Sequence, residues 1–173
     1  MTTTRLTVGQ LIERMHDALQ LEHVDATDGL ERVIESPNVS SPGLVLAGYV
    51  ERFPTRRLQV LGETEIMYLK SLDADVRRRN LETFFSFRIP CVFVTKGQEP
   101  GQDLKDIAAA AGVAVIRSRL KTNEFYTRIK PWLEEEFAPS TNLHGSLADI
   151  FGVGLLFVGR SGIAEALFTQ AVT

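Results

Sequence analysis

The sequence has little of several features that would place a chain in a familiar class. It holds one cysteine, Cys91, so no disulfide can form within the chain, and this usage is typical of the reducing cytosol. The opening stretch MTTTRLTVGQ lacks the apolar core of a signal peptide, and no run approaches the roughly 20 apolar residues that a membrane span requires. We therefore expect a soluble, cytoplasmic protein without a membrane partner.

An excess of positive charge is also lacking. The net charge is −3 and the pI is about 5.7, which argues against a general nucleic-acid surface. The one basic cluster, Arg77 to Arg79, lies in a helical stretch and is explained by a solvated helix face. Two of the histidines, His16 and His23, lack the spacing of metal ligands. We expect neither nucleic-acid binding nor a metal site.

Apolar residues are plentiful and are arranged in alternating segments. They make up 44% of the 173 residues, enough for the core of one full domain and part of a second. A continuous apolar strand at Cys91–Thr95 is followed by a helix at Leu104–Ala111, which Gly112 ends, and by another strand at Val113–Ile116. This order predicts an α/β domain with a parallel sheet. The sheet is expected to bury Val60, Val92, Val94, Val113 and Val115.

Capping residues predict where several other elements begin. Thr7 is expected to cap a helix that ends near Leu19, and Ser41 before Pro42 predicts a helix over Leu44–Phe53. Asp73 and Thr122 are expected to cap later helices in the same way. The remaining expected elements are strands at Leu21–Val24, Leu30–Ile34 and Leu58–Leu61, and helices at Thr64–Leu72, Ala74–Phe85 and Thr122–Phe137, the last kinked or restarted at Pro131.

A linker, Ala138-Pro139-Ser140, separates this domain from the rest of the chain. Beyond it, Leu143–Ile150 and Val153–Val158 read as two strands around a Phe151-Gly152 turn. The sequence thus predicts a first domain over residues 1–138 and, over residues 139–173, the truncated start of a second.

The stretch from Gly152 to Ala166, GVGLLFVGRSGIAEA, reads as a strand, a glycine-rich turn and the start of a helix. A phosphate-binding loop, G-x-x-x-x-G-K-[ST], has this order: its lysine reaches the β and γ phosphates and its hydroxyl holds Mg²⁺. Counted from Gly159, the last three places hold Ala164, Glu165 and Ala166. Because the lysine is replaced by a carboxylate and the hydroxyl is missing, we expect no cofactor at this loop.

The chain resembles the HPr kinase/phosphorylase family from about Leu6 to Ile163. The resemblance lies in SSPGLVLAGYVERFPTRRLQVLGETEIMYL at Ser40–Leu69, in IPCVFVTKGQEP, and in the series Leu-His-Gly, Ala-Asp and Gly-Val-Gly that leads into G-x-S-G. It implies a first domain similar to that of Mur ligases, a homo-oligomeric, hexameric assembly, and a kinase that uses ATP or pyrophosphate with Mg²⁺ to phosphorylate and dephosphorylate a serine of the HPr phosphocarrier, regulating carbon use.

A lone histidine in a strand is usually a structural residue, but the resemblance, carried over residue by residue, implies that His144 is a vestigial phosphate-site residue, and both interpretations stay open. The family's catalytic aspartates and HPr-docking helix lie downstream of the loop, and we expect this chain to lack them. The degenerate nucleotide loop comprises Gly159, Arg160, Ser161, Gly162, Ile163, Ala164, Glu165 and Ala166, whose backbone N–H groups would hold at most a small anion.

Three hypotheses remain open from the sequence. The first is a catalytically inactive family member that acts as a regulatory, ligand-binding or oligomerisation module. The second is a fragment or altered product of an active HPr serine kinase. The third is a sensor of nucleotide sugars or sugar phosphates, for which Gly43 and Gly48 admit a ligand near a helix start; close helix packing is the alternative reading of these two glycines.

Overall fold

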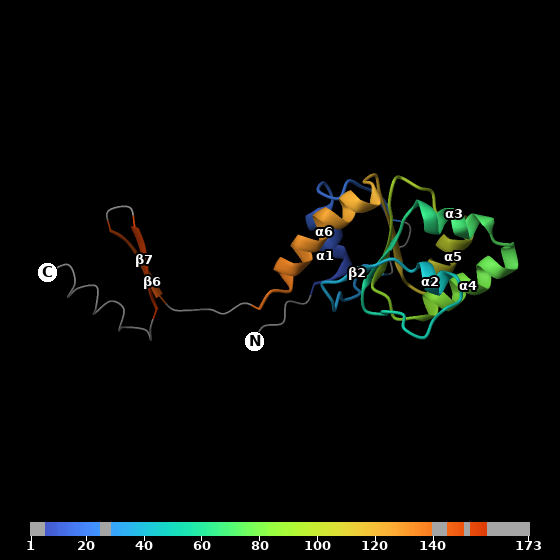
Figure 1. Ribbon diagram of the computed structural model, residues 1–173, viewed down its shortest axis with the longest axis horizontal. Helices are drawn as coiled ribbons and strands as arrows, with labels where there is room; N and C mark the ends of the chain where they lie inside the picture. The colour runs from blue at the N-terminus through green and yellow to red at the C-terminus, as the bar shows by residue number, and fades with distance from the viewer. Residues whose placement is uncertain (1–5, 25–28, 140–144, 151–152, 159–173) are drawn as a thin grey trace. The chain divides into compact units, whose positions relative to one another are not determined.

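The computed structural model describes residues 6–24, 29–139, 145–150 and 153–158 (Figure 1). The chain divides into two units, Thr2–Ala138 and a second that contains Pro139–Thr173. Among the helices that the structure describes, none is long and apolar enough to cross a membrane.

A five-stranded sheet forms the centre of the first unit, with the order β1-β5-β4-β3-β2. Neighbouring strands from β2 to β5 run parallel, whereas β1 pairs antiparallel with β5 at the edge. The predicted α/β domain with a parallel sheet is therefore confirmed, and all five valines expected inside it are fully buried. The strands are β1 Leu21–Val24, β2 Val39–Ser40, β3 Leu58–Leu61, β4 Cys91–Val94 and β5 Ala114–Ser118.

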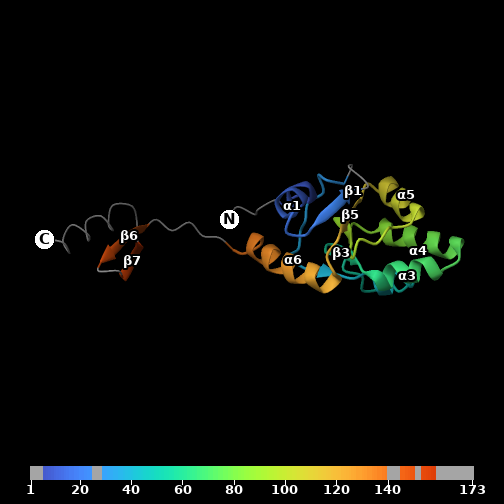
Figure 2. The ribbon, with the colours of Figure 1, turned by 90° about the horizontal axis from the view of Figure 1, so that it is seen from above.

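Helices cover both faces of this sheet, so the unit has three layers (Figures 1 and 2). Alternate strand residues point to opposite faces, and Val60 and Phe93 share one core with α1 and α6, whereas Val92 and Val94 share the other with α2 to α5. The helices are α1 Val8–Met15, α2 Gly43–Leu46, α3 Glu63–Ser71, α4 Ala74–Ser86, α5 Gln102–Ala110 and α6 Thr122–Glu136.

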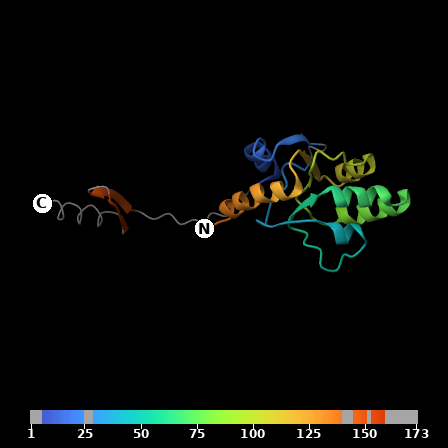
Figure 3. The ribbon, with the colours of Figure 1, turned by 45° about the horizontal axis from the view of Figure 1, so that its top comes forward.

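Contacts between distant parts of the chain hold the layer formed by α1 and α6. Arg14 of α1 forms an ion pair with Glu136 of α6, and Figure 3 shows the two helices, in blue and orange, in the same part of the unit. The Ser118 hydroxyl at the end of β5 donates to the carbonyl of Leu19, 99 positions earlier. The first segment of the chain is therefore bound to its last strand and last helix.

Several predicted boundaries hold because their capping chemistry is present. Thr7 accepts a hydrogen bond from the backbone N–H of Gln10, whose side chain accepts one from the N–H of Thr7, so both orphan donors are satisfied. Gly112 follows α5 with a φ of 62°, the left-handed conformation that glycine adopts most readily.

Other expected boundaries are wrong. The helix expected over Leu44–Phe53 ends at Leu46, and Gly48, with a φ of 95°, turns the chain away. The strand expected over Leu30–Ile34 is only an isolated bridge between Val33 and Thr7. The first helix ends at Met15, and a turn over residues 16–20, with Gln20 at a φ of 47°, leads from there into β1.

Two expected caps also differ. Asp73 occupies the N-cap position of α4 but makes no side-chain capping bond. Thr122 is the first residue of α6, because Lys121 has the extended backbone conformation of the N-cap, and the Thr122 hydroxyl contacts that of Thr95 instead. Pro131 lies within α6, which continues through it from Thr122 to Glu136 without a restart.

The described part of the second unit is a two-stranded antiparallel pair. Strand β6, Gly145–Ile150, pairs with β7, Val153–Val158, in a register that places Ile150 opposite Val153 and Gly145 opposite Val158. Both strands were predicted from the sequence.

Candidate functional site

The residues of the predicted nucleotide loop, 159–166, lie outside the described residues, and so does His144. Strand β7 ends at Val158, directly before this loop. The loop chemistry therefore remains a prediction from the sequence, and the candidate site of the described residues lies in the first unit.

The two glycines proposed as a ligand site lie in different surroundings. A Cβ at Gly43 would lie 3.5 Å from Oε1 of Glu65 and 3.9 Å from the hydroxyl of Ser41, so this glycine borders a group of polar side chains. A Cβ at Gly48 would meet nothing within 4 Å. The structure thus does not bring the two glycines into one described cluster of polar groups.

Polar side chains next to Gly43 form a network at the carboxyl edge of the sheet, where ligands of open α/β folds usually bind. Glu65 Oε1 accepts from the Ser41 hydroxyl at 2.5 Å, and its Oε2 accepts from the N–H of Gly62 at 2.9 Å. Beside them, the hydroxyl oxygens of Thr95 and Thr122 lie 2.7 Å apart. These groups satisfy one another, so the network joins the ends of β2, β3 and β4 to α3 and α6.

Burial and nearby charges shift two pKa values at this edge. The hydrogen bond from Lys96, together with its charge, lowers the pKa of the exposed Glu63 carboxyl. Burial raises the pKa of the Tyr126 hydroxyl, and the negative charge of Glu65 raises it further. Tyr126 therefore stays protonated and Glu63 ionised at neutral pH. Within the described part of the chain, no three histidine, cysteine, aspartate or glutamate side chains are grouped to hold a metal.

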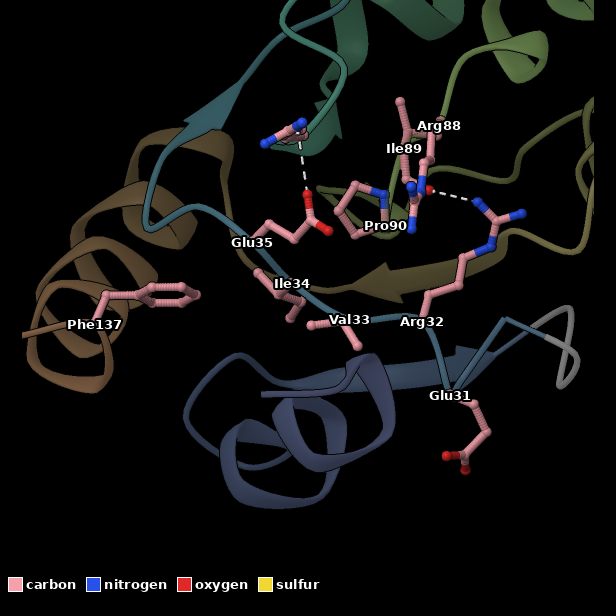
Figure 4. A pocket seen from close by; sticks show the side chains of 10 residues that line it. Glu31, Arg32, Val33, Ile34, Glu35, Arg88, Ile89, Pro90 and Phe137 are labelled. Carbon is pink, nitrogen blue, oxygen red and sulfur yellow. Dashed lines mark hydrogen bonds and ion pairs between the residues drawn. The ribbon is translucent and has the colours of Figure 1, made fainter. Parts of the chain in front are cut away.

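A pocket lies at the opposite, amino edge of the sheet, and we call it the amino-edge pocket (Figure 4). Its volume is about 840 Å³, within the usual range of small-ligand sites. Five of its residues, from three different segments, form what we call the apolar wall. The wall consists of Val33, Ile34, Ile89, Pro90 and Phe137, and the charged residues of the pocket are Glu31, Glu35, Arg32, Arg56 and Arg88.

The three arginines of this pocket differ in how they are held. Arg32 is half-buried and donates to the carbonyl oxygens of Ile89 at 2.9 Å and of Ala111 at 2.6 Å. Arg56 pairs with Glu35 at 3.4 Å while its side chain stays 76% exposed. Arg88 is exposed and has no ion pair or hydrogen bond within the described residues. The pocket therefore holds one fixed guanidinium, one loosely paired and one open to a ligand.

No local motif in the sequence marks this pocket. Arg32, Arg56 and Arg88 come from three separated segments, and only the sheet brings them together. The available signal was that Arg56 and Arg88 each stand shortly before a predicted strand, because the amino ends of parallel strands share one edge. Nothing in the sequence indicates that Arg32 reaches the same edge.

Residues 6–133 match the family described as HPr serine kinase N terminus. The chain belongs to the HPr serine kinase family. The resemblance expected from the sequence is thereby confirmed, and the matched residues include every strand of the five-stranded sheet and all three arginines of the amino-edge pocket. This family domain is thus the part of the chain that carries the candidate site.

Curated relatives of this HPr serine kinase family domain are HPr kinase/phosphorylases. The chain is 35% identical over 150 residues to HPr kinase/phosphorylase 1 of Oceanobacillus iheyensis, covering 87% of this chain and 48% of the relative. It is 36% identical over 160 residues to the Clostridium perfringens protein, covering 92% and 52%. The Exiguobacterium protein is 36% identical over 157 residues, covering 91% and 49%. The chain spans about half the length of these relatives.

A structural likeness to the CBS and DRTGG domains of the regulatory region of Clostridium perfringens pyrophosphatase is weak. The TM-score is 0.47 at 13% identity, covering 69% of this chain and 45% of that chain. A likeness this distant does not indicate a function.

Proposed function

We propose that this HPr kinase family chain acts as a regulatory binding module and transfers no phosphoryl group. The observation that carries the proposal is the composition of the loop after β7: Glu165 stands at the place of the phosphate-reaching lysine and Ala166 at the place of the hydroxyl that holds Mg²⁺. Phosphoryl transfer depends almost wholly on positioning and charge stabilisation. A carboxylate at the lysine position works against both.

A radioactive transfer assay tests this proposal. The chain is incubated with an HPr phosphocarrier and either ATP-Mg²⁺ or pyrophosphate, with the Clostridium perfringens HPr kinase/phosphorylase as the active control. We expect no phosphoserine on HPr from this chain. Transfer above background would overturn the proposal.

Isothermal titration with ATP-Mg²⁺ is the second measurement. We expect no measurable binding, because the loop offers backbone N–H groups but no lysine. Micromolar affinity that Arg160→Ala abolishes would show that the loop works without its lysine, and the proposed inactivity would then be wrong.

The binding role is proposed for the first unit. It is supported by the amino-edge pocket, which is large enough for a small ligand and is lined by three arginines. This observation favours, as the second candidate function, a sensor of nucleotide sugars or sugar phosphates. Homo-oligomer formation, HPr as a partner and a cytoplasmic location belong to the same proposal, and they are supported by family membership alone.

A thermal-shift panel of nucleotide sugars and sugar phosphates tests the binding role. A ligand that raises the unfolding temperature, and raises it further at higher ligand concentration, supports the binding role. A panel without a single shift would count against the binding role and leave oligomerisation as the remaining function of this unit.

A further inference from the structure

We propose that the amino-edge pocket binds a small phosphate ester: Arg56 and Arg88 hold the phosphate, and the apolar wall contacts the body of the ligand. The inference rests on the proposed binding role and deepens it by naming a place and a chemical class. It is independent of the loop at residues 159–166.

The first argument is the state of Arg88. This side chain is exposed at the pocket and has no partner in the described part of the chain. A guanidinium presents five N–H donors in a planar fork that matches the oxygens of a phosphate. All the donors of Arg88 are therefore available to a ligand.

The second argument is the fixed charge of Arg32. Two carbonyl oxygens hold its guanidinium, one shortly before β4 and one directly after α5. Carbonyls orient the group without neutralising it, and only two of its five N–H donors are used. In Figure 4, the guanidinium of Arg32 points to the carbonyl of Ile89, the residue that follows Arg88, whereas Glu31 points away from it. Arg32 thus supplies a permanent positive charge that attracts a phosphate.

The third argument concerns Glu35, which is the acid that works against an anionic ligand. Its carboxylate pairs with Arg56 at 3.4 Å, longer than a normal charged hydrogen bond. Arg56 is 76% exposed in this pair and Glu35 is 39% exposed, so the pair is solvated and contributes little to stability. A phosphate can replace Glu35 as the partner of Arg56 at a small cost in free energy, and the Glu35 side chain then turns to solvent.

The apolar wall decides what the phosphate is attached to. Ile34, Ile89 and Pro90 are buried, so the apolar surface that a ligand can contact comes from Val33 and from Phe137, which faces the pocket from the end of α6 (Figure 4). The aromatic ring of Phe137 offers a flat apolar face, on which a base or another planar group can stack. The ligand class is therefore a phosphate ester with a planar, largely apolar body, such as a nucleoside monophosphate.

Isothermal titration of the full chain with adenosine monophosphate tests the inference, with adenosine and inorganic phosphate as the two partial ligands. We expect AMP to bind more tightly than either. Arg88→Gln should weaken AMP binding by about tenfold or more, since it removes a charge-assisted contact. Glu35→Gln should strengthen it, because the competing carboxylate is gone. The matched control is Arg79→Gln, an exposed arginine of α4 outside the pocket, which should leave binding unchanged.

Each of the following outcomes would contradict the proposal or one part of it. No AMP binding at millimolar concentration, or equal binding by the native chain and Arg88→Gln, would overturn the inference. Equal affinity for inorganic phosphate and AMP would overturn the role of the apolar wall. Stabilisation by a nucleotide sugar that Arg88→Gln does not alter would overturn the pocket assignment while leaving the proposed binding role in place.

Discussion

The hydroxyl oxygens of Thr95 and Thr122 lie 2.7 Å apart and join the end of β4 to the first turn of α6. Thr95 is fully buried and also donates toward the carbonyl of Leu61 at 3.3 Å. Replacing Thr95 by valine keeps the shape and leaves the Thr122 hydroxyl without this partner. We expect the free energy of unfolding to fall by about 1 to 2 kcal/mol, measured by urea denaturation.

The matched variants are Thr122→Val and the double variant. If the two hydroxyls act on each other, the double variant should lose less stability than the sum of the single changes. Strict additivity would show that the pair contributes nothing as a pair.

Val94 is buried in the middle of the sheet, and we expect Val94→Asp to unfold the first unit. A carboxylate there has no partner and costs several kcal/mol, a large part of the stability of a typical domain. Circular dichroism should show loss of the cooperative transition. Met67→Asp is the control, because Met67 is 56% exposed and the charge remains in water. An equally stable Val94→Asp variant would contradict the placement of β4.

Gly48 tests the turn that ends α2. Its φ of 95° is a conformation that an L side chain adopts only with strain, so Gly48→Ala should destabilise the chain by about 1 kcal/mol. Gly43→Ala is the comparison, because the added Cβ meets only ordinary contacts with Glu65 and Ser41. The midpoint of thermal unfolding should fall for Gly48→Ala and stay unchanged for Gly43→Ala. A fall for Gly43→Ala alone would contradict the left-handed conformation of Gly48.

Glu63 gives a pH dependence of known sign. Lys96 lowers its pKa in the folded state, so the stabilising contribution of this carboxylate is present above its ordinary pKa of 4.5 and is lost as the pH falls through the lower folded value. We expect the native chain to be more stable than Glu63→Gln at pH 6 and the difference to shrink as acid is added. A constant difference across that range would exclude a role for the Lys96 contact.

The reaction rate of the Cys91 thiol measures how often the first unit unfolds. Burial raises the pKa of its thiol far above the ordinary range, so the reactive thiolate is absent from the folded chain. Iodoacetamide should label Cys91 only at the rate at which the unit opens, and urea should accelerate labelling. Rapid labelling without denaturant would mean that β4 is accessible from solvent.

Much of the first unit was predictable because its signals are local. Apolar segments predicted β3, β4 and β5, and the capping residue Thr7 predicted the start of α1. The length of α2 was missed because Gly48 ends it, although Leu44 to Phe53 reads as a helix in composition.

The amino-edge pocket was not predicted, because the sequence shows neither which strand ends share an edge nor where an arginine on a loop points. Arg32 binds carbonyls that lie 57 and 79 positions further along the chain. Such contacts depend on the completed sheet. The opposite holds for Gly159 to Ala166, where the sequence carries the whole hypothesis and the described residues do not test it.

The pairing of β1 with β5 determines the order in which this chain can fold during its synthesis. Leu21 pairs with Ser118, so a nascent chain that ends before β5 holds no partner for its first strand. Contacts of such long sequence separation form slowly, since a long loop must close before they are gained. The amino-terminal segment is made first on the ribosome but cannot complete its contacts until β5 emerges, so we expect it to be the part of the domain that most needs protection from wrong partners until then.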